Sequence, residues 1–179
     1  MFKEQLEKDE LHLKSYAIVD VIVSSIQTLI NENKSIEIYN GTGNSVDLSD
    51  YQIWRVSNGG TWPEASIVLS GTLLDGNVFV VSNNAASATI LAVTDTVSGT
   101  ASWNGDDAVG LAKFDGSSWN LIDAVGEDGP DPGTGWDVAG TTNATLNHTL
   151  VRKSDVCSPN TDWDASRGTN TVNSEWIVY

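Results

Sequence analysis

Basic side chains are scarce in this sequence. Nine Lys and Arg stand against 24 Asp and Glu, which gives a formal net charge of −15. A nucleic-acid-binding protein needs clustered Lys or Arg to displace counterions from phosphates, but Arg152 and Lys153 are the only adjacent basic pair here. The charge therefore predicts that this chain alone binds neither DNA nor RNA, and it disfavours an anionic membrane surface for the same reason.

Cysteine and long apolar runs are also nearly absent. Cys157 is the only cysteine, so no disulfide within the chain is possible. No apolar run reaches the length of about 18 residues that a transmembrane helix needs, so none is predicted. Residues 16–30 are largely apolar, but Asp20 and Gln27 interrupt them and the acidic segment EQLEKDELHLK precedes them. We therefore predict no signal peptide in this chain.

Residues and motifs typical of catalysis are few. His12 and His148 are the two histidines, and neither a His-rich metal spacing nor a G-x-S-x-G nucleophile elbow occurs. A Ser-His-Asp arrangement stays open from sequence, because such triads are recognised by geometry. We expect that the chain is not an enzyme, and a hydrolase is the least favoured of three functional hypotheses.

The character of the sequence changes at about residue 17. Residues 1–16 are charged and lack Gly, which predicts a short helix or a flexible arm. Residues 17–179 contain short apolar or alternating runs separated by Gly, Asn, Asp and Ser, a pattern typical of a β-sandwich or barrel. The predicted strands are AIVDVIVSSI, SIEIYN, YQIWRV, SIVLSG, NVFVVSN, DAVGLAKF, WNLIDAV, HTLVRK and EWIVY. The prediction is one all-β domain over residues 17–179.

The turns between these runs have recognisable chemistry. Asp115-Gly116 is the strongest hairpin signal, because these residue types tolerate the positive φ of tight turns. The stretch EDGPDPGTG contains two prolines and three glycines and is predicted to be a loop. The Ala-rich start of AASATILAVTD is the one place where a short helix is expected between strands.

Four strings in this sequence resemble bacterial lamin-tail domains, immunoglobulin-like modules named after the tail of nuclear lamins. They are SIEIYNGTGNSVDLSDYQIW, GTLLDGNVFVVSN, WNGDDAVGLAKFDGSSWNLIDAVGEDGPDPGTGW and NHTLVRKSDVCSPNTDWDASRGTNTVNSEWIVY. Together they place residues 21–179 within the resemblance. It implies an immunoglobulin-like antiparallel β-sandwich.

The resemblance also implies a supporting, non-catalytic role. Such modules often accompany secreted hydrolases or surface proteins, and they are thought to assist attachment or targeting. This implies an extracellular or cell-surface location and a protein or surface polymer as the partner. The opening strand departs from the family pattern, because Ser25 stands where a Glu is expected and Leu29-Ile30 stand where a Gly/Ser-rich turn is expected.

That divergent opening segment is apolar and poor in charge. If it forms an edge strand, its free backbone groups can pair with a second copy of the chain. Self-association as a homodimer is therefore one hypothesis. The residues assigned to this surface are Val19, Val21, Ile22, Val23, Ile26, Leu29 and Ile30.

Tryptophan is abundant, with seven residues in the chain. Trp54 and Trp62 flank the Gly-rich hairpin segment VSNGGT, and exposed rings at such positions would stack on sugars. A carbohydrate-binding module is therefore the alternative to a protein-interaction module. Packing is the other interpretation of these rings, because indoles bury large areas and anchor loops.

Acidic residues gather in two predicted loops. Calcium prefers six to eight oxygen ligands, and loops rich in Asp, Gly and Asn can supply them. The candidate ligands are Asp106, Asp107, Glu127, Asp128 and Asp131. The D-x-D-x-D-G spacing is missing, and side-chain bonds that hold a turn explain the Asp106-Asp107 pair equally well. Calcium is the one cofactor that these loops suggest, and otherwise none is expected.

Overall fold

The structure is a computed structural model that describes residues 21–28 and 32–179. The arm predicted for residues 1–16 lies outside the described residues, as do Val19, Leu29 and Ile30 of the predicted self-association surface.

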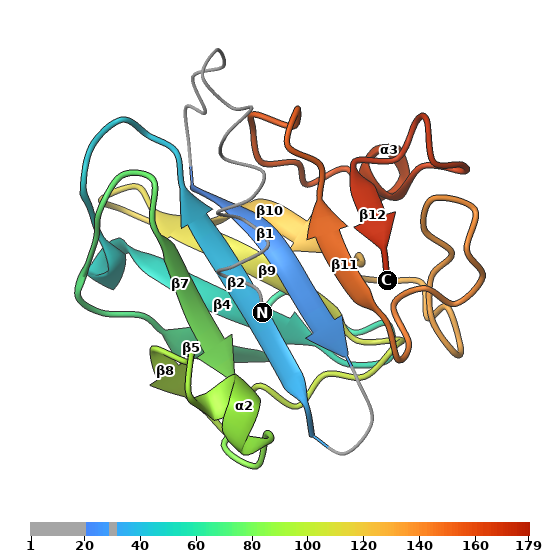
Figure 1. Cartoon of the computed structure of the whole chain (residues 1–179), viewed down its shortest axis with the longest axis horizontal. Helices are drawn as coiled ribbons and strands as arrows, with labels where there is room; N and C mark the ends of the chain where they lie inside the picture. Colours follow the sequence, from blue (N-terminus) through green and yellow to red (C-terminus); the bar gives the residue numbers. More distant parts are fainter. Residues whose placement is uncertain (1–20, 29–31) are drawn as a thin grey trace.

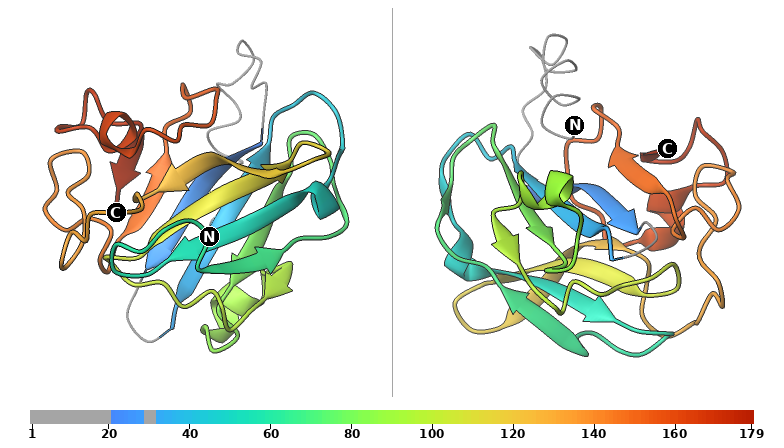
Figure 2. Two further views of the ribbon diagram at one scale, coloured as in Figure 1. Left: turned by 180° about the vertical axis from the view of Figure 1, so that it is seen from behind. Right: turned by 60° about the horizontal axis from the view of Figure 1, so that its bottom comes forward.

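The described chain forms a sandwich of two antiparallel sheets (Figures 1 and 2). Its elements are β1 (Val21–Thr28), β2 (Lys34–Asn40), β3 (Val46–Asp47), η2 (Leu48–Asp50), β4 (Tyr51–Val56), β5 (Ala65–Val68), β6 (Thr72–Leu73), β7 (Val78–Ser82), α2 (Ala88–Leu91), β8 (Thr96–Val97), β9 (Ala108–Phe114), β10 (Trp119–Val125), β11 (Thr149–Arg152), α3 (Trp163–Arg167) and β12 (Trp176–Val178). One sheet has the strand order β12-β11-β1-β2-β7-β8 and the other β10-β9-β4-β5, with β3 and β6 as a separate pair. Among the strands of the described residues, β7 and β8 are the one pair that runs in parallel.

All nine predicted strands are present, and so is the short helix expected after Ala85-Ala86, which is α2. The all-β prediction is confirmed. Three strands that were not predicted, β3, β6 and β8, have two residues each. Two residues show no alternation of apolar and polar side chains, so such short strands leave no sequence signal. The Asp115-Gly116 turn joins β9 to β10, with φ +98° at Gly116.

The core lies between the two larger sheets. Inward side chains of β2 and β7, Ile36, Ile38 and Val81, belong to one cluster with Ile53 of β4 and Leu111 of β9. Burying one side chain of this kind stabilises a fold by about 1.5–3 kcal/mol, so alternate residues of these strands hold the layers together. The inner face of each sheet is thus occupied by core packing, whereas the outer face of each sheet is not part of this core.

The first described strand is not at an edge. β1 lies between β2 and β11 and pairs with both (Figure 1). Val23 and Ile26 point into the core and are buried. The interpretation of this segment as an edge strand that pairs with a second copy is therefore wrong, because both of its edges are already occupied. Homodimerisation by another surface stays a prediction.

Residues 126–148 cross one end of the sandwich between β10 and β11 (Figure 1). Within this stretch the only ladder contact is an isolated bridge between Val138 and Thr141, so the loop predicted at EDGPDPGTG is confirmed. Trp136 anchors the stretch against Trp163 of α3, with ring centroids 6.2 Å apart, and Trp163 packs in turn on Trp176 of β12 at 6.5 Å. The edge-to-face geometry is one that aromatic pairs prefer.

Candidate functional site

The outward face of the four-stranded sheet is unusually apolar. Tyr51 and Ile53 of β4 point into the core, so Gln52 and Trp54 between them point outward. Paired residues in neighbouring strands lie on the same side of the sheet. Ala112 and Val68 therefore point outward with Gln52, and Gly110 and Ser66 lie on the same side as Trp54. We call this surface the aromatic face. It comprises Gln52, Trp54, Trp62, Ser66, Val68, Gly110, Ala112, Phe114, Trp119 and Leu121.

The absence of a side chain at Gly110 lets two larger groups settle on the sheet. A Cβ placed there would lie 2.4 Å from Leu121 Cδ1 and 3.4 Å from Trp62 Cη2. Leu121 and the Trp62 indole therefore meet above this glycine, one from β10 and the other from the β4–β5 hairpin. Gly110 thus shapes the aromatic face by leaving room for both side chains.

A pair of aromatic rings lies farther along the same face. Phe114 and Trp119 are opposite each other on β9 and β10, with ring centroids 5.4 Å apart and planes inclined by 43°. Both rings are half-buried. Val68 on the edge strand β5 is more exposed than either ring, at 64%. The solvent side of an antiparallel sheet normally alternates to polar residues, so this composition marks the face as a candidate interaction surface.

The two predicted sugar-binding tryptophans share this face but differ in exposure. Trp54 is 8% exposed, and its indole N–H donates to Gln52 Oε1 at 3.0 Å. Trp62 is half-buried and packs against the core cluster, which leaves part of its ring accessible. Trp54 therefore supports the surface, whereas Trp62 forms part of it. Phe114, Trp119 and Leu121 are not among the binding residues predicted from the sequence, although they occupy outward positions in their strands.

The predicted calcium ligands are spread over separate environments. Asp107 Oδ2 accepts the Asn104 N–H at 3.0 Å and lies near Arg55, which matches the turn-holding alternative. Burial and the nearby charge of Asp164 raise the pKa of Glu127, which Arg167 opposes, and Asp131 Oδ1 accepts the Gly133 N–H at 2.7 Å. Across residues 21–28 and 32–179, no group of three or more His, Cys, Asp or Glu side chains is arranged to hold a metal ion. The described geometry therefore lends no support to the calcium site.

Asp107 is the most constrained of these carboxylates. The residue is 8% exposed, and its Oδ1 is buried without a hydrogen-bond partner in the part of the chain that the structure describes. Burial raises the pKa of Asp107, and the hydrogen bond from Asn104 opposes the increase. An ionised oxygen without a donor is costly to bury. We therefore expect the ionisation of Asp107 to affect the stability of the fold, and its surroundings do not indicate a bound ligand.

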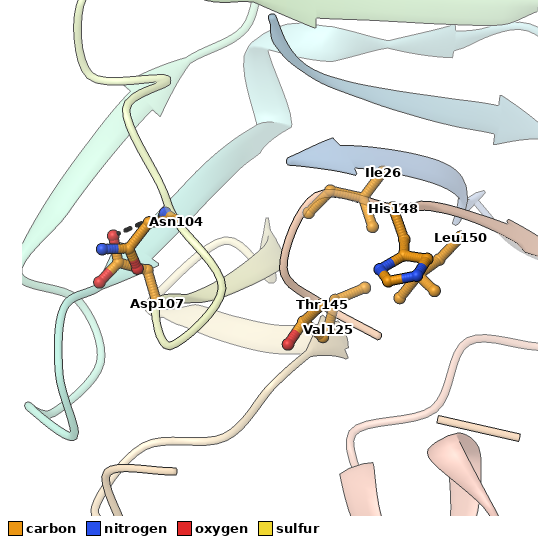
Figure 3. A pocket seen from close by; sticks show the side chains of 7 residues that line it. All are labelled: Ile26, Asn104, Asp107, Val125, Thr145, His148 and Leu150. Atoms are coloured by element: carbon orange, nitrogen blue, oxygen red, sulfur yellow. Dashed lines mark hydrogen bonds between the residues drawn. The ribbon is translucent and has the colours of Figure 1, made fainter. Parts of the chain in front are cut away.

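His148 lines a small cavity between the sheets and the loop 126–148 (Figure 3). The lining residues are Ile26, Asn104, Asp107, Val125, Thr145, His148 and Leu150. Its volume is about 10 Å³, which is the room of one water molecule. Thr145 Oγ1 already donates to Gly105 O and accepts from Trp136 N, and His148 Nδ1 lies 2.6 Å from Leu146 O. The cavity is too small for a substrate, so the hydrolase hypothesis gains no support from it.

Two buried charged residues, Asp123 and Arg152, belong to a structural network. Arg152 of β11 donates to Asp123 Oδ1 of β10 and to Glu175 Oε2, both at 2.7 Å. Asp123 also accepts the N–H groups of Val23 and Asn160, at 2.7 and 3.0 Å. Burial raises the pKa of Asp123, and Arg152 and these backbone donors oppose the increase. The network ties one sheet to the other and to the C-terminal segment.

Fold and surface together define an immunoglobulin-like β-sandwich module. A family model described as Lamin Tail Domain matches residues 14–129, well over half of the chain, and the protein belongs to this family of non-catalytic modules. The match includes β1 to β10 but ends before β11 and β12. No curated protein and no solved structure matches the chain. Among the described residues, no helix is long and apolar enough to span a membrane.

Proposed function

We propose that this protein is a non-catalytic interaction domain that attaches its parent protein to a partner through the aromatic face. The observation that carries this proposal is the composition of that face. Trp62, Phe114, Trp119 and Leu121 are half-buried, and Val68 is largely exposed, on the side of a sheet that water normally wets. Family membership supports the non-catalytic character of the role.

A partner on this face removes apolar surface from water. Each Å² of apolar surface that is buried contributes about 25 cal/mol before the costs of association. Hot spots of binding are enriched in Trp and are surrounded by less important contacts. Trp62 fits this description, because it shares the face with Gln52 and Ser66 and with Val68 on the edge strand β5. The site therefore has the composition of a binding surface and not of a reaction centre.

The proposal is tested with the full chain fused to a fluorescent protein and applied to isolated cell envelopes of the source organism. Val68→Lys places a charge on the aromatic face and is expected to abolish retention on the envelopes. Val172→Lys is the matched control, because Val172 is 89% exposed and lies between α3 and β12 rather than on this sheet. It should bind like the unmodified fusion.

Melting temperatures of both variants show whether the fold is retained. If Val68→Lys remains folded and binds envelopes as well as the unmodified fusion, the aromatic face is not the attachment surface.

A further inference from the structure

We infer that the aromatic face binds a neutral polysaccharide chain, with Trp62 as the principal stacking platform. This inference rests on the proposed function, because it names the partner of the same surface. It follows from three features of the face: its lack of charge, the spacing of its aromatic groups and the polar groups beside them.

The first feature is electrostatic. The chain carries a formal charge of −15, yet no outward position of β4, β5, β9 or β10 is occupied by a charged residue. The charged side chains of these strands, Arg55, Lys113 and Asp123, alternate with the outward positions and fall on the inner side. A ligand with many charges would find no counter-charge here, so a neutral ligand fits this surface best.

Charge also argues against a second copy as the occupant. Two copies that meet through this face bring two chains of −15 together, and no basic side chain on the face offsets the repulsion. A neutral polymer pays no such cost. Its binding is therefore expected to depend little on ionic strength.

The second feature is the separation of the aromatic groups. Trp62 lies over Gly110, and the Phe114–Trp119 pair begins four residues farther along β9. At about 3.3 Å per residue the two positions are roughly 13 Å apart. One sugar ring cannot span this distance, whereas a chain of linked pyranoses lying along the strands can contact both positions. Leu121 fills the space between them and keeps the surface apolar.

The third feature is the set of polar groups next to the rings. Pyranose rings present C–H bonds on their faces and hydroxyl groups around their rims, so a binding site needs flat apolar rings with hydrogen-bonding groups beside them. Gln52 uses Oε1 to accept the Trp54 N–H, and that bond does not involve its amide N–H groups. The Ser66 hydroxyl is exposed on the strand beside Trp54. These two groups are placed to bind rim hydroxyls while Trp62 contacts the ring face.

The test is native affinity electrophoresis of the full chain in gels that contain hydroxyethylcellulose, glucomannan, mixed-linkage β-glucan or, as an anionic comparison, polygalacturonate. At least one neutral polysaccharide should retard the protein, and polygalacturonate should not. Trp62→Ala should raise the Kd for that polysaccharide about tenfold or more. Trp62→Phe keeps a ring at this position and should retain most of the binding.

Tyr179→Ala is the matched aromatic control, because Tyr179 is exposed but follows β12 at the edge of the other sheet. It should be retarded like the wild type. The inference is overturned if no neutral polysaccharide retards the wild type, if polygalacturonate retards it equally, or if a folded Trp62→Ala variant is retarded unchanged.

Envelope binding separates this inference from the proposed function. Envelopes treated with protease should still bind the fusion, and envelopes treated with periodate, which oxidises sugars, should not. The opposite result, with binding still sensitive to Val68→Lys, would refute the polysaccharide and leave the aromatic face as a protein-binding surface.

Discussion

Replacing Arg152 with Met removes the cation at the centre of the buried charge network. The side chains of Arg152 and Asp123 are 2% and 0% exposed, and Glu175 is 23% exposed. Met retains an apolar side chain against the Trp176 ring, over which the guanidinium lies at 4.2 Å. The main effect is therefore to leave the Asp123 carboxylate buried without its counter-ion.

Loss of one partner from such a pair costs about 3–5 kcal/mol of the free energy of unfolding. Since about 1 kcal/mol shifts the melting temperature of a domain of this size by roughly 2–4 °C, the expected decrease is about 6–20 °C. Urea unfolding followed by far-UV circular dichroism and by tryptophan fluorescence measures the free energy. Agreement between the two probes shows that unfolding is two-state.

Arg167→Met is the matched control, because Arg167 pairs with Asp164 at the surface, where the two side chains are 30% and 68% exposed. An exposed pair contributes about 0–1 kcal/mol. The double variant Asp123→Leu/Arg152→Met removes the buried carboxylate together with its cation and should recover part of the loss, because the charge that remains, Glu175, is 23% exposed. The argument is refuted if Arg152→Met costs no more than Arg167→Met.

Three further predictions concern the loops. Burial raises the folded-state pKa of Asp107 above its ordinary value of 3.8, so the stability it contributes is present below that value and is lost as pH rises through the folded pKa. The stability of Asp107→Asn relative to the wild type should therefore increase from pH 3.8 to about pH 7 in urea unfolding, and a constant difference would contradict this. Millimolar calcium should leave the melting temperature where a chelator leaves it, and an increase with calcium would restore the calcium site. Gly168 has φ +57° and ψ −179°, and a Cβ there would lie 2.6 Å from the backbone of Ser174. Gly168→Ala should therefore cost about 1–3 kcal/mol or more, and more than Gly43→Ala, whose added methyl group meets open space; equal losses in thermal unfolding would show that the contact is not limiting.

Much of the fold could be predicted because its signals are local. Alternation in Ile36-Glu37-Ile38 places every second side chain of β2 in the core, and Asp115-Gly116 supplies the turn between β9 and β10. Such features depend on neighbouring residues alone, so they can be recognised in the sequence. Part of the candidate site could also be predicted, since Trp54 and Trp62 flank a Gly-rich hairpin segment in the sequence.

The remaining features depend on residues that are distant in the sequence. Ser25 pairs with Val151, which makes β1 a central strand although its apolar sequence fits an edge strand equally well. A bulge between Leu121 and Asp123 turns Leu121 outward and Asp123 inward, where strict alternation would put both on one side. No local pattern contains these contacts.

The sequence by itself determined that this protein is an acidic β-sandwich without an internal disulfide, because alternation, turn chemistry and charge are properties of the chain. Its lamin-tail type came from the resemblance of whole sequence strings, and the family match agrees with it. Only the tertiary structure decided that Trp54 is buried beneath the aromatic face while part of Trp62 remains accessible, and that the acidic loop residues lie in separate turns. The physical reason is that exposure and mutual distance depend on which strands pair. Pairing is set by the packing of the whole core, and no short segment specifies it.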